Sequence, residues 1–358
     1  MDIEGIIGFL SPWVVCAVIT VLHVGLPAVV RKGRDRTGKP LRYKLNGHLV
    51  LPGAILLWLV LGYLRLVPWD WAYRIRWYGL AGSATLGLVF ALAAVLPRPG
   101  RGRNFLADLW LGRSENPRYE KGSLLLDAKV WLYLCGTVTL QINVLSFLAR
   151  HLETFDPYNP GFLLAAMLLT FSVWESLSFE GANLYADGFV AERPGLKLGL
   201  GRLAFRPHFH LAVLWLTAET PDPGRPAWTY ANAIAVFAAG WILFRGATLQ
   251  KYYFAIAPEK RFLGMRQLPL GEGGLSFPSG GFWGTCRHVD CLGEFFMSVG
   301  ITLAAGSAGI PVWPYPLCCG ILLFLRQLGE EKLAAEKYGP SWQKYREKVR
   351  YRIVPYLY

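Results

Sequence analysis

The chain of 358 residues is 53% hydrophobic and 14% aromatic, and only 17% of it is charged. Soluble domains carry about 25% charged residues. The formal net charge of +13 is concentrated in loops between apolar runs, which is typical of the excess of basic residues on the cytoplasmic side of membrane proteins. The composition predicts an all-α, polytopic transmembrane helix bundle and argues against a nucleic-acid-binding protein or a pair of soluble domains.

The apolar runs predict about nine to ten spans, because one span needs roughly 20 mostly apolar residues. The first run lacks a preceding basic region, so we interpret it as a span and not as a cleaved signal peptide. Residues 306–311 are expected to be the turn of a helical hairpin. The predicted spans are residues 6–30, 47–66, 78–96, 130–149, 162–177 and 230–244, with 209–217, 294–305 and 312–325 less clear.

Loop charges predict the orientation of the spans. Segments 31–44 and 97–121 are strongly basic, so they should face the cytoplasm. The N-terminus would then be lumenal and the C-terminus cytoplasmic, in the endoplasmic reticulum membrane. The tail, residues 329–358, should continue a helix to Lys337, break at Gly339 and begin a second, amphipathic helix at Ser341, lying on the membrane interface.

Charged residues at membrane depth are costly and mark candidate functional sites. In an antiparallel final hairpin, Arg287 and Glu294 would lie at the level of Arg326 and Glu330. Two interpretations remain open: structural ion pairs, or a polar cleft for the phosphates of a nucleotide. The polar groups occur in four places: Glu175, Glu180 and Asp187; Arg206, His208 and His210; Arg287, His288, Asp290 and Glu294; Arg326, Glu330 and Glu331.

Motifs for metals and phosphates are lacking in the sequence. Gly271–Gly274 and Gly280–Gly281 have no strand–turn–helix frame, so neither is a dinucleotide fingerprint. There is no HExxH motif and no P-loop. His208 and His210 would point to different faces of a helix, and the six cysteines have no metal or disulfide spacing, so we expect no metal.

Short motifs in a fixed order carry a resemblance over nearly the whole chain. The C-terminal motifs include Arg326, Glu330-Glu331, Lys337-Tyr338-Gly339, Trp342, Tyr345 and Tyr351-Arg352-Ile353; the upstream ones include Leu41–Gly47, Gly112–Arg118, Asp187-Gly188-Phe189, Phe244–Lys251, Trp283-Gly284 and Cys286–Glu294. This pattern resembles the sterol reductase family, which reduces double bonds of sterols with NADPH.

The chain departs from the family pattern at several positions. Ala255 stands where the family has an arginine after Lys251, and Arg202 stands where it has an aspartate. The family's Pro-Asn-Tyr is Val289-Asp290-Cys291 here. The tyrosine that serves as proton donor in the family aligns with His210. These changes affect the expected reaction and substrate more than the expected scaffold.

The resemblance implies one membrane domain, with N-terminal spans in residues 1–206 and a catalytic and cofactor-binding half in 207–358. It implies an NADPH cleft open to the cytoplasm and a tunnel for a sterol or related terpenoid that enters from membrane lipid. His210 and Glu330 would deliver a proton to the double bond before hydride transfer. The expected cofactor residues are Lys251, Trp283, Arg287, His288, Asp290, Glu294, Arg326 and Tyr338, and the expected substrate residues are Glu175, Glu180, Asp187 and Phe209.

Two alternatives to the reductase remain. The first is a double-bond isomerase on the same scaffold, which would transfer no hydride. The changes at Ala255 and Asp290 favour it, because they should weaken a phosphate site. The second is a non-catalytic lipid-binding protein, and the retention of Arg326, Glu330 and Tyr338 argues against it.

Overall fold

A computed structural model describes all of the chain except residues 1–2, 36–38, 101–103, 123, 272–275 and 307–311. The chain forms two compact units. Unit 1 comprises Met1–Leu184 and Phe189–Pro223, and unit 2 comprises Tyr185–Gly188 and Gly224–Tyr358. Residues 307–311 of the predicted hairpin turn and residues 272–274 of the glycine-rich segment fall outside the described residues.

The fold is that of an all-α, polytopic membrane protein. Five of the described helices are long and apolar enough to cross a membrane: α1 (Ile3–Gly25), α4 (Arg76–Val95), α6 (Ala128–Thr154), α7 (Pro160–Ser178) and α13 (Ala227–Ile256). They coincide with five of the predicted spans. The apolar α2 (Gly47–Tyr63) is a shorter helix of 17 residues.

The helix α6 forms the centre of unit 1. Its most apolar stretch is 72% buried, and it contacts α1, α2, α7 and α11 (Arg206–Phe209). Small residues permit this packing: a Cβ on Gly136 would lie 2.0 Å from the Arg202 carbonyl oxygen. Asp127 caps the helix by accepting hydrogen bonds from the backbone N–H groups of Lys129 and Val130 at 3.0 and 3.2 Å.

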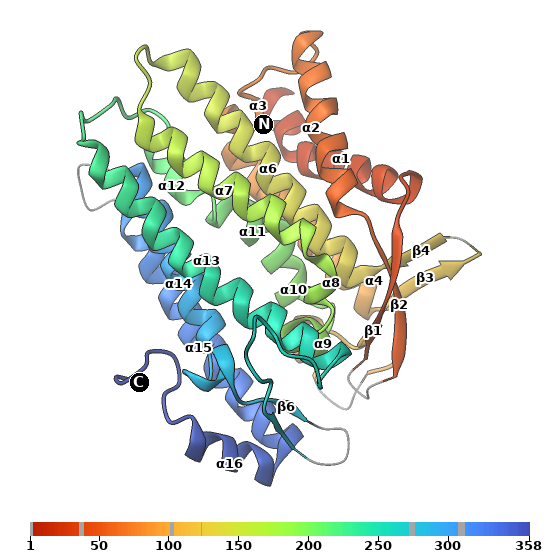
Figure 1. The fold of residues 1–358 in the computed structure, drawn as a ribbon. Coiled ribbons are helices and arrows are strands. Elements are labelled where there is room, and N and C mark those ends of the chain that lie inside the picture. The colour runs from red at the N-terminus through yellow and green to blue at the C-terminus, as the bar shows by residue number, and fades with distance from the viewer. Residues whose placement is uncertain (1–2, 36–38, 101–103, 123, 272–275, 307–311) are drawn as a thin grey trace. The chain divides into compact units, whose positions relative to one another are not determined.

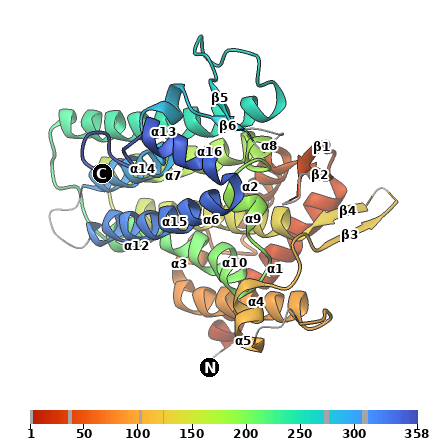
Figure 2. The ribbon, with the colours of Figure 1, turned by 90° about the horizontal axis from the view of Figure 1, so that it is seen from below.

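Unit 1 also contains two small antiparallel hairpins, which we expected to be loops. β1 (Val29–Arg34) pairs with β2 (Pro40–Leu45), and β3 (Arg118–Lys121) pairs with β4 (Leu124–Asp127). Figure 2 shows both hairpins at one edge of the unit. The predicted span 6–30 is therefore too long, because its last two residues belong to β1.

Close helix packing defines unit 2. α13 packs along α14 (Val289–Ala305) through glycines, since a Cβ on Gly293 would lie 2.6 Å from the Gly240 carbonyl oxygen. α15 (Pro314–Tyr338) packs against α14 (Figure 1). Gly339, at a φ of +51° that favours glycine, ends α15. The final helix, α16 (Pro340–Lys348), begins one residue before the predicted Ser341.

The remaining elements are short. In unit 1 they include α3 (Trp71–Arg74), α5 (Phe105–Leu111), α8 (Glu180–Asn183), α10 (Leu196–Leu200), the π-helix Gly201–Phe205 and α12 (Ala212–Thr217). α9 (Asp187–Ala191) begins in unit 2 and ends in unit 1. Unit 2 has β5 (Pro269–Leu270), β6 (Phe277–Pro278) and the 3-10 turn Gly281–Gly284. The predicted span 209–217 corresponds to the last residue of α11, a turn and the whole of α12, and not to one membrane helix.

Candidate active site in the C-terminal unit

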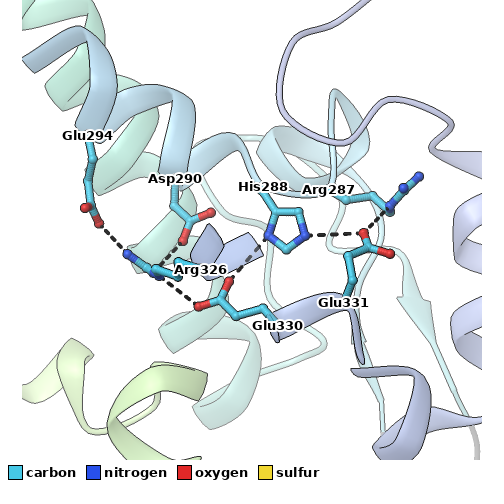
Figure 3. A network of polar contacts seen from close by, with 7 residues as sticks. All are labelled: Arg287, His288, Asp290, Glu294, Arg326, Glu330 and Glu331. Atoms are coloured by element: carbon cyan, nitrogen blue, oxygen red, sulfur yellow. Dashed lines mark hydrogen bonds and ion pairs between the residues drawn. The ribbon is translucent and has the colours of Figure 1, made fainter. Parts of the chain in front are cut away.

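Seven charged or titratable side chains form one network in unit 2 (Figure 3). They come from the segment before α14, from the first turns of α14 and from α15. The antiparallel pairing of α14 and α15 brings them together, as the sequence predicted. The network consists of Arg287, His288, Asp290, Glu294, Arg326, Glu330 and Glu331.

Arg326 joins three carboxylates. Its Nη1 donates to Glu294 Oε1 at 2.9 Å, and its Nη2 donates to Asp290 Oδ2 at 3.2 Å. Its Nε donates to Glu330 Oε1 at 2.9 Å, within the same helix. A guanidinium presents several donors in one plane, so Arg326 fixes the positions of three acids from two helices.

His288 lies between two carboxylates. Its Nδ1 is 3.4 Å from Glu330 Oε2, and its Nε2 is 3.3 Å from Glu331 Oε1. Burial alone would lower the pKa of His288, but the hydrogen bonds to Glu330 and Glu331 outweigh burial and raise it. Burial opposes ionisation of Glu331 too, yet His288 and Arg287 lower its pKa to about 2. Within this group of three, the proton is therefore favoured on His288 over either carboxylate.

Arg287 attaches the chain's C-terminal segment to the network. The side chain is buried, and its Nε donates to Glu331 Oε1 at 2.6 Å. Its Nη1 donates to the carbonyl oxygens of Val349 and Arg350 at 2.8 and 2.9 Å. The backbone N–H groups of Arg287 and His288 donate to the carbonyls of Tyr351 and Arg352. The segment after α16 is thus held by side-chain and backbone bonds together.

Three further predicted cofactor residues lie in unit 2. Lys251 Nζ lies over the Trp283 ring, 5.2 Å from its centroid. Trp283 Nε1 donates to the Ala247 carbonyl at 2.9 Å, and the Tyr345 hydroxyl donates to the Trp283 carbonyl at 2.7 Å. The ring of Tyr338 packs against Phe277, with 4.6 Å between the centroids.

The contacts of the network favour hydrogen-bonded recognition over a metal centre. One ligand atom each of His288, Asp290 and Cys291 lies within 4.8 Å of the others. Both imidazole nitrogens of His288 already face carboxylates, and Asp290 is bonded to Arg326. Asp290 Oδ1 is buried and has no hydrogen-bond partner among the described residues, so it can accept a bond from a hydroxyl or amide of a ligand.

The other predicted site residues belong mainly to unit 1. His210 follows α11, and its ring lies against the rings of Phe205 and Phe209 at 6.1 and 5.9 Å between centroids. Its pairing with Glu330, which is in unit 2, stays a prediction.

Of the predicted substrate residues, Glu175 and Glu180 are buried in unit 1. Glu180 Oε2 accepts a hydrogen bond from the backbone N–H of Gly47 at 3.0 Å. Burial raises the pKa of Glu180 to about 7, although that hydrogen bond favours the ionised form. Phe209 stacks on Phe205 at 4.3 Å, and Asp187 begins α9. Their roles toward a substrate stay predictions.

The sequence alone gave no distinct role to Glu331. Glu330 and Glu331 are adjacent, so on α15 their side chains point in directions about 100° apart. One carboxylate therefore meets Arg326 and the other meets Arg287. The signal in the sequence was the acidic pair itself, because each member can serve a different basic partner.

Fold and site together define a polytopic helical membrane protein with a charged network at one end of its C-terminal helices. The chain belongs to the ergosterol biosynthesis ERG4/ERG24 family, whose model matches residues 7–358.

The chain is also similar to several named proteins. The Delta(14)-sterol reductase erg24A of Aspergillus fumigatus is 28% identical, over 94% of this chain and 79% of its own. The Delta(14)-sterol reductase TM7SF2 of Mus musculus is 28% identical, over 97% and 86%. The Delta(14)-sterol reductase of Methylotuvimicrobium alcaliphilum is 30% identical, over 72% and 59%.

Proposed function

We propose that the protein is a membrane-embedded, NADPH-dependent reductase of a carbon–carbon double bond in a sterol or related terpenoid. Family membership and the names of the relatives support a sterol double-bond reductase. The observation that carries the finer proposal is the His288–Glu330–Arg326 arrangement, in which the buried imidazole of His288 faces the half-buried carboxylate of Glu330.

The residues present fit a reduced nicotinamide nucleotide in two respects. The partnerless Oδ1 of Asp290 suits a ribose hydroxyl or a carboxamide N–H. Lys251 beside the indole of Trp283 offers a cation for a phosphate. When bound, NADPH would supply the hydride. Arg326 and Arg287 in this structure hold carboxylates, so we assign them to positioning the site's acids.

Residues of this chain would supply the proton that the reduction of an alkene requires. An isolated alkene accepts hydride only after protonation, which creates a carbocation. Hydrogen bonding to His288 and the charge of Arg326 lower the pKa of Glu330 despite its burial, so Glu330 is a carboxylate at neutral pH. An ionised Glu330 would stabilise the cation and pass on a proton from His288. His210 remains the proposed donor to the alkene.

The charge balance of the network favours one alternative, a double-bond isomerase. The network contains four carboxylates against two guanidinium groups and one imidazole, which suits proton exchange better than the binding of a polyanion. A double-bond isomerase that protonates and deprotonates without hydride would use the same residues.

Turnover of a sterol panel tests the proposal. Membranes containing the protein would be incubated with sterol dienes, with and without NADPH, and the products analysed by mass spectrometry. A gain of two hydrogen atoms that requires NADPH supports the reductase. A shifted double bond at unchanged mass supports the isomerase, and no change with any diene contradicts both.

A further inference from the structure

An open pocket of about 690 Å³ lies in unit 2, between the end of α15, α16 and the segment that follows. Arg287 is the one residue that it shares with the charged network, and the other lining residues lie beyond Glu331 in the chain. The lining residues are Arg287, Ala335, Gly339, Trp342, Gln343, Arg346, Glu347, Arg350 and Arg352.

The backbone that surrounds the pocket is held in place by contacts with the rest of unit 2. The buried Nη1 of Arg287 holds the carbonyls of Val349 and Arg350. Trp342 and Tyr345 are buried against Phe277, which anchors α16. The arginines at 346, 350 and 352 therefore line the pocket from a backbone that is held at several points.

The charges of the pocket are unbalanced. Four arginines line it and only one acid, Glu347, faces them. Arg287 is paired with Glu331, and Arg352 Nη1 donates to the Tyr358 hydroxyl at 2.7 Å. For the side chains of Arg346 and Arg350, the described part of the chain contains no ion-pair or hydrogen-bond partner. Gathering such cations at one place costs electrostatic free energy that an anion would offset.

We propose that this pocket binds a phosphate group, either of an anionic phospholipid headgroup or of a soluble phosphate compound. Guanidinium groups match phosphate oxygens with paired donors. A lipid source is within reach because large apolar side chains of α15 are exposed up to Leu333. Ala335, at the pocket, is two residues further on, which is about 3 Å along a helix. The proposal does not depend on the reductase activity.

Binding of a phosphate probe to the purified full chain tests the proposal without substrate or cofactor. Native mass spectrometry from micelles containing phosphatidic acid or phosphatidylcholine would count lipid adducts, and calorimetry would follow inorganic pyrophosphate. The pocket variant is Arg346→Gln with Arg350→Gln. The matched control is Lys332→Gln with Lys344→Gln, which removes two exposed charges from α15 and α16 outside the lining.

The pocket variant should bind the phosphate probe about tenfold or more weakly, and the control should stay close to wild type. If the pocket variant loses binding of phosphatidic acid alone, the site takes a lipid headgroup. If it loses binding of pyrophosphate alone, the site takes a soluble phosphate. Equal loss in both double variants would overturn the proposal in favour of general surface charge. Absence of binding to wild type, or displacement of pyrophosphate by NADPH, would overturn it as a separate site.

Discussion

The Nε of Arg287 and the Oε1 of Glu331 lie 2.6 Å apart, and this pair joins the segment before α14 to α15. The two side chains are 4% and 12% exposed. Removing one partner of a buried pair typically costs about 3–5 kcal/mol, because a charge remains without its partner.

Glu331→Ala should therefore lower the free energy of unfolding by about 3 kcal/mol or more. Glu336→Ala removes an exposed carboxylate from the same helix and should change stability by no more than about 0.5 kcal/mol. Thermal unfolding in detergent measures both. Similar effects of the two variants would show that the Arg287–Glu331 pair adds little to stability.

The raised pKa of His288 predicts a pH dependence of stability. A group whose pKa is higher in the folded protein stabilises it fully below its unfolded pKa, about 6.5, and this contribution is lost as pH rises through the folded value. The wild-type unfolding temperature should therefore fall from about pH 6.5 upward. His288→Gln should flatten that decline, whereas His48→Gln, which removes an exposed imidazole from α2, should not. An unchanged slope in His288→Gln contradicts the assignment.

Lys251 and Ala255 allow a test of the cofactor site. They are four residues apart on α13, so they share one helix face. Lys251→Ala should weaken NADPH binding by about tenfold or more, the typical loss of one hydrogen bond to a charged group. Ala255→Arg should strengthen it, because it adds a second cation to that face. Calorimetry measures both, and an NADPH affinity that neither variant changes would separate Lys251 from the phosphates.

The length of α6 predicts that the loops at its two ends lie on opposite sides of the membrane. Its 27 residues extend roughly 40 Å, more than the 30 Å thickness of the hydrocarbon layer. Lys121→Cys, in the exposed hairpin before α6, should be labelled from the cytoplasmic side of vesicles and Tyr158→Cys from the other side. Five of the six native cysteines are buried and Cys318 is half-buried, so background should be low. Labelling of both positions from one side contradicts this topology.

Features that depend on hydropathy, length and local charge could be predicted from the sequence. Long apolar runs such as 130–149 predicted helices well, since hydropathy and length alone define a span. The polar ends of the final hairpin also came together as predicted, because antiparallel helices place Asp290 beside Arg326.

The short hairpins and the separate roles of the two acids were not predicted. β1 and β2 were hidden because their charged residues obscured the buried alternation of Tyr43 and Leu45. The partner of Glu331 depends on a tertiary contact with Arg287, which no local pattern contains.

Isotope tracing of turnover tests the central claim most directly. Purified protein would convert a sterol diene in deuterated water with unlabelled NADPH, and Glu330→Gln would serve as the matched variant. A reductase that uses its own proton network should yield product with one deuterium from solvent and one hydrogen from the cofactor, and Glu330→Gln should lower the rate by about a hundredfold or more. Deuterium incorporated without net reduction, or an unchanged rate in Glu330→Gln, would contradict the account.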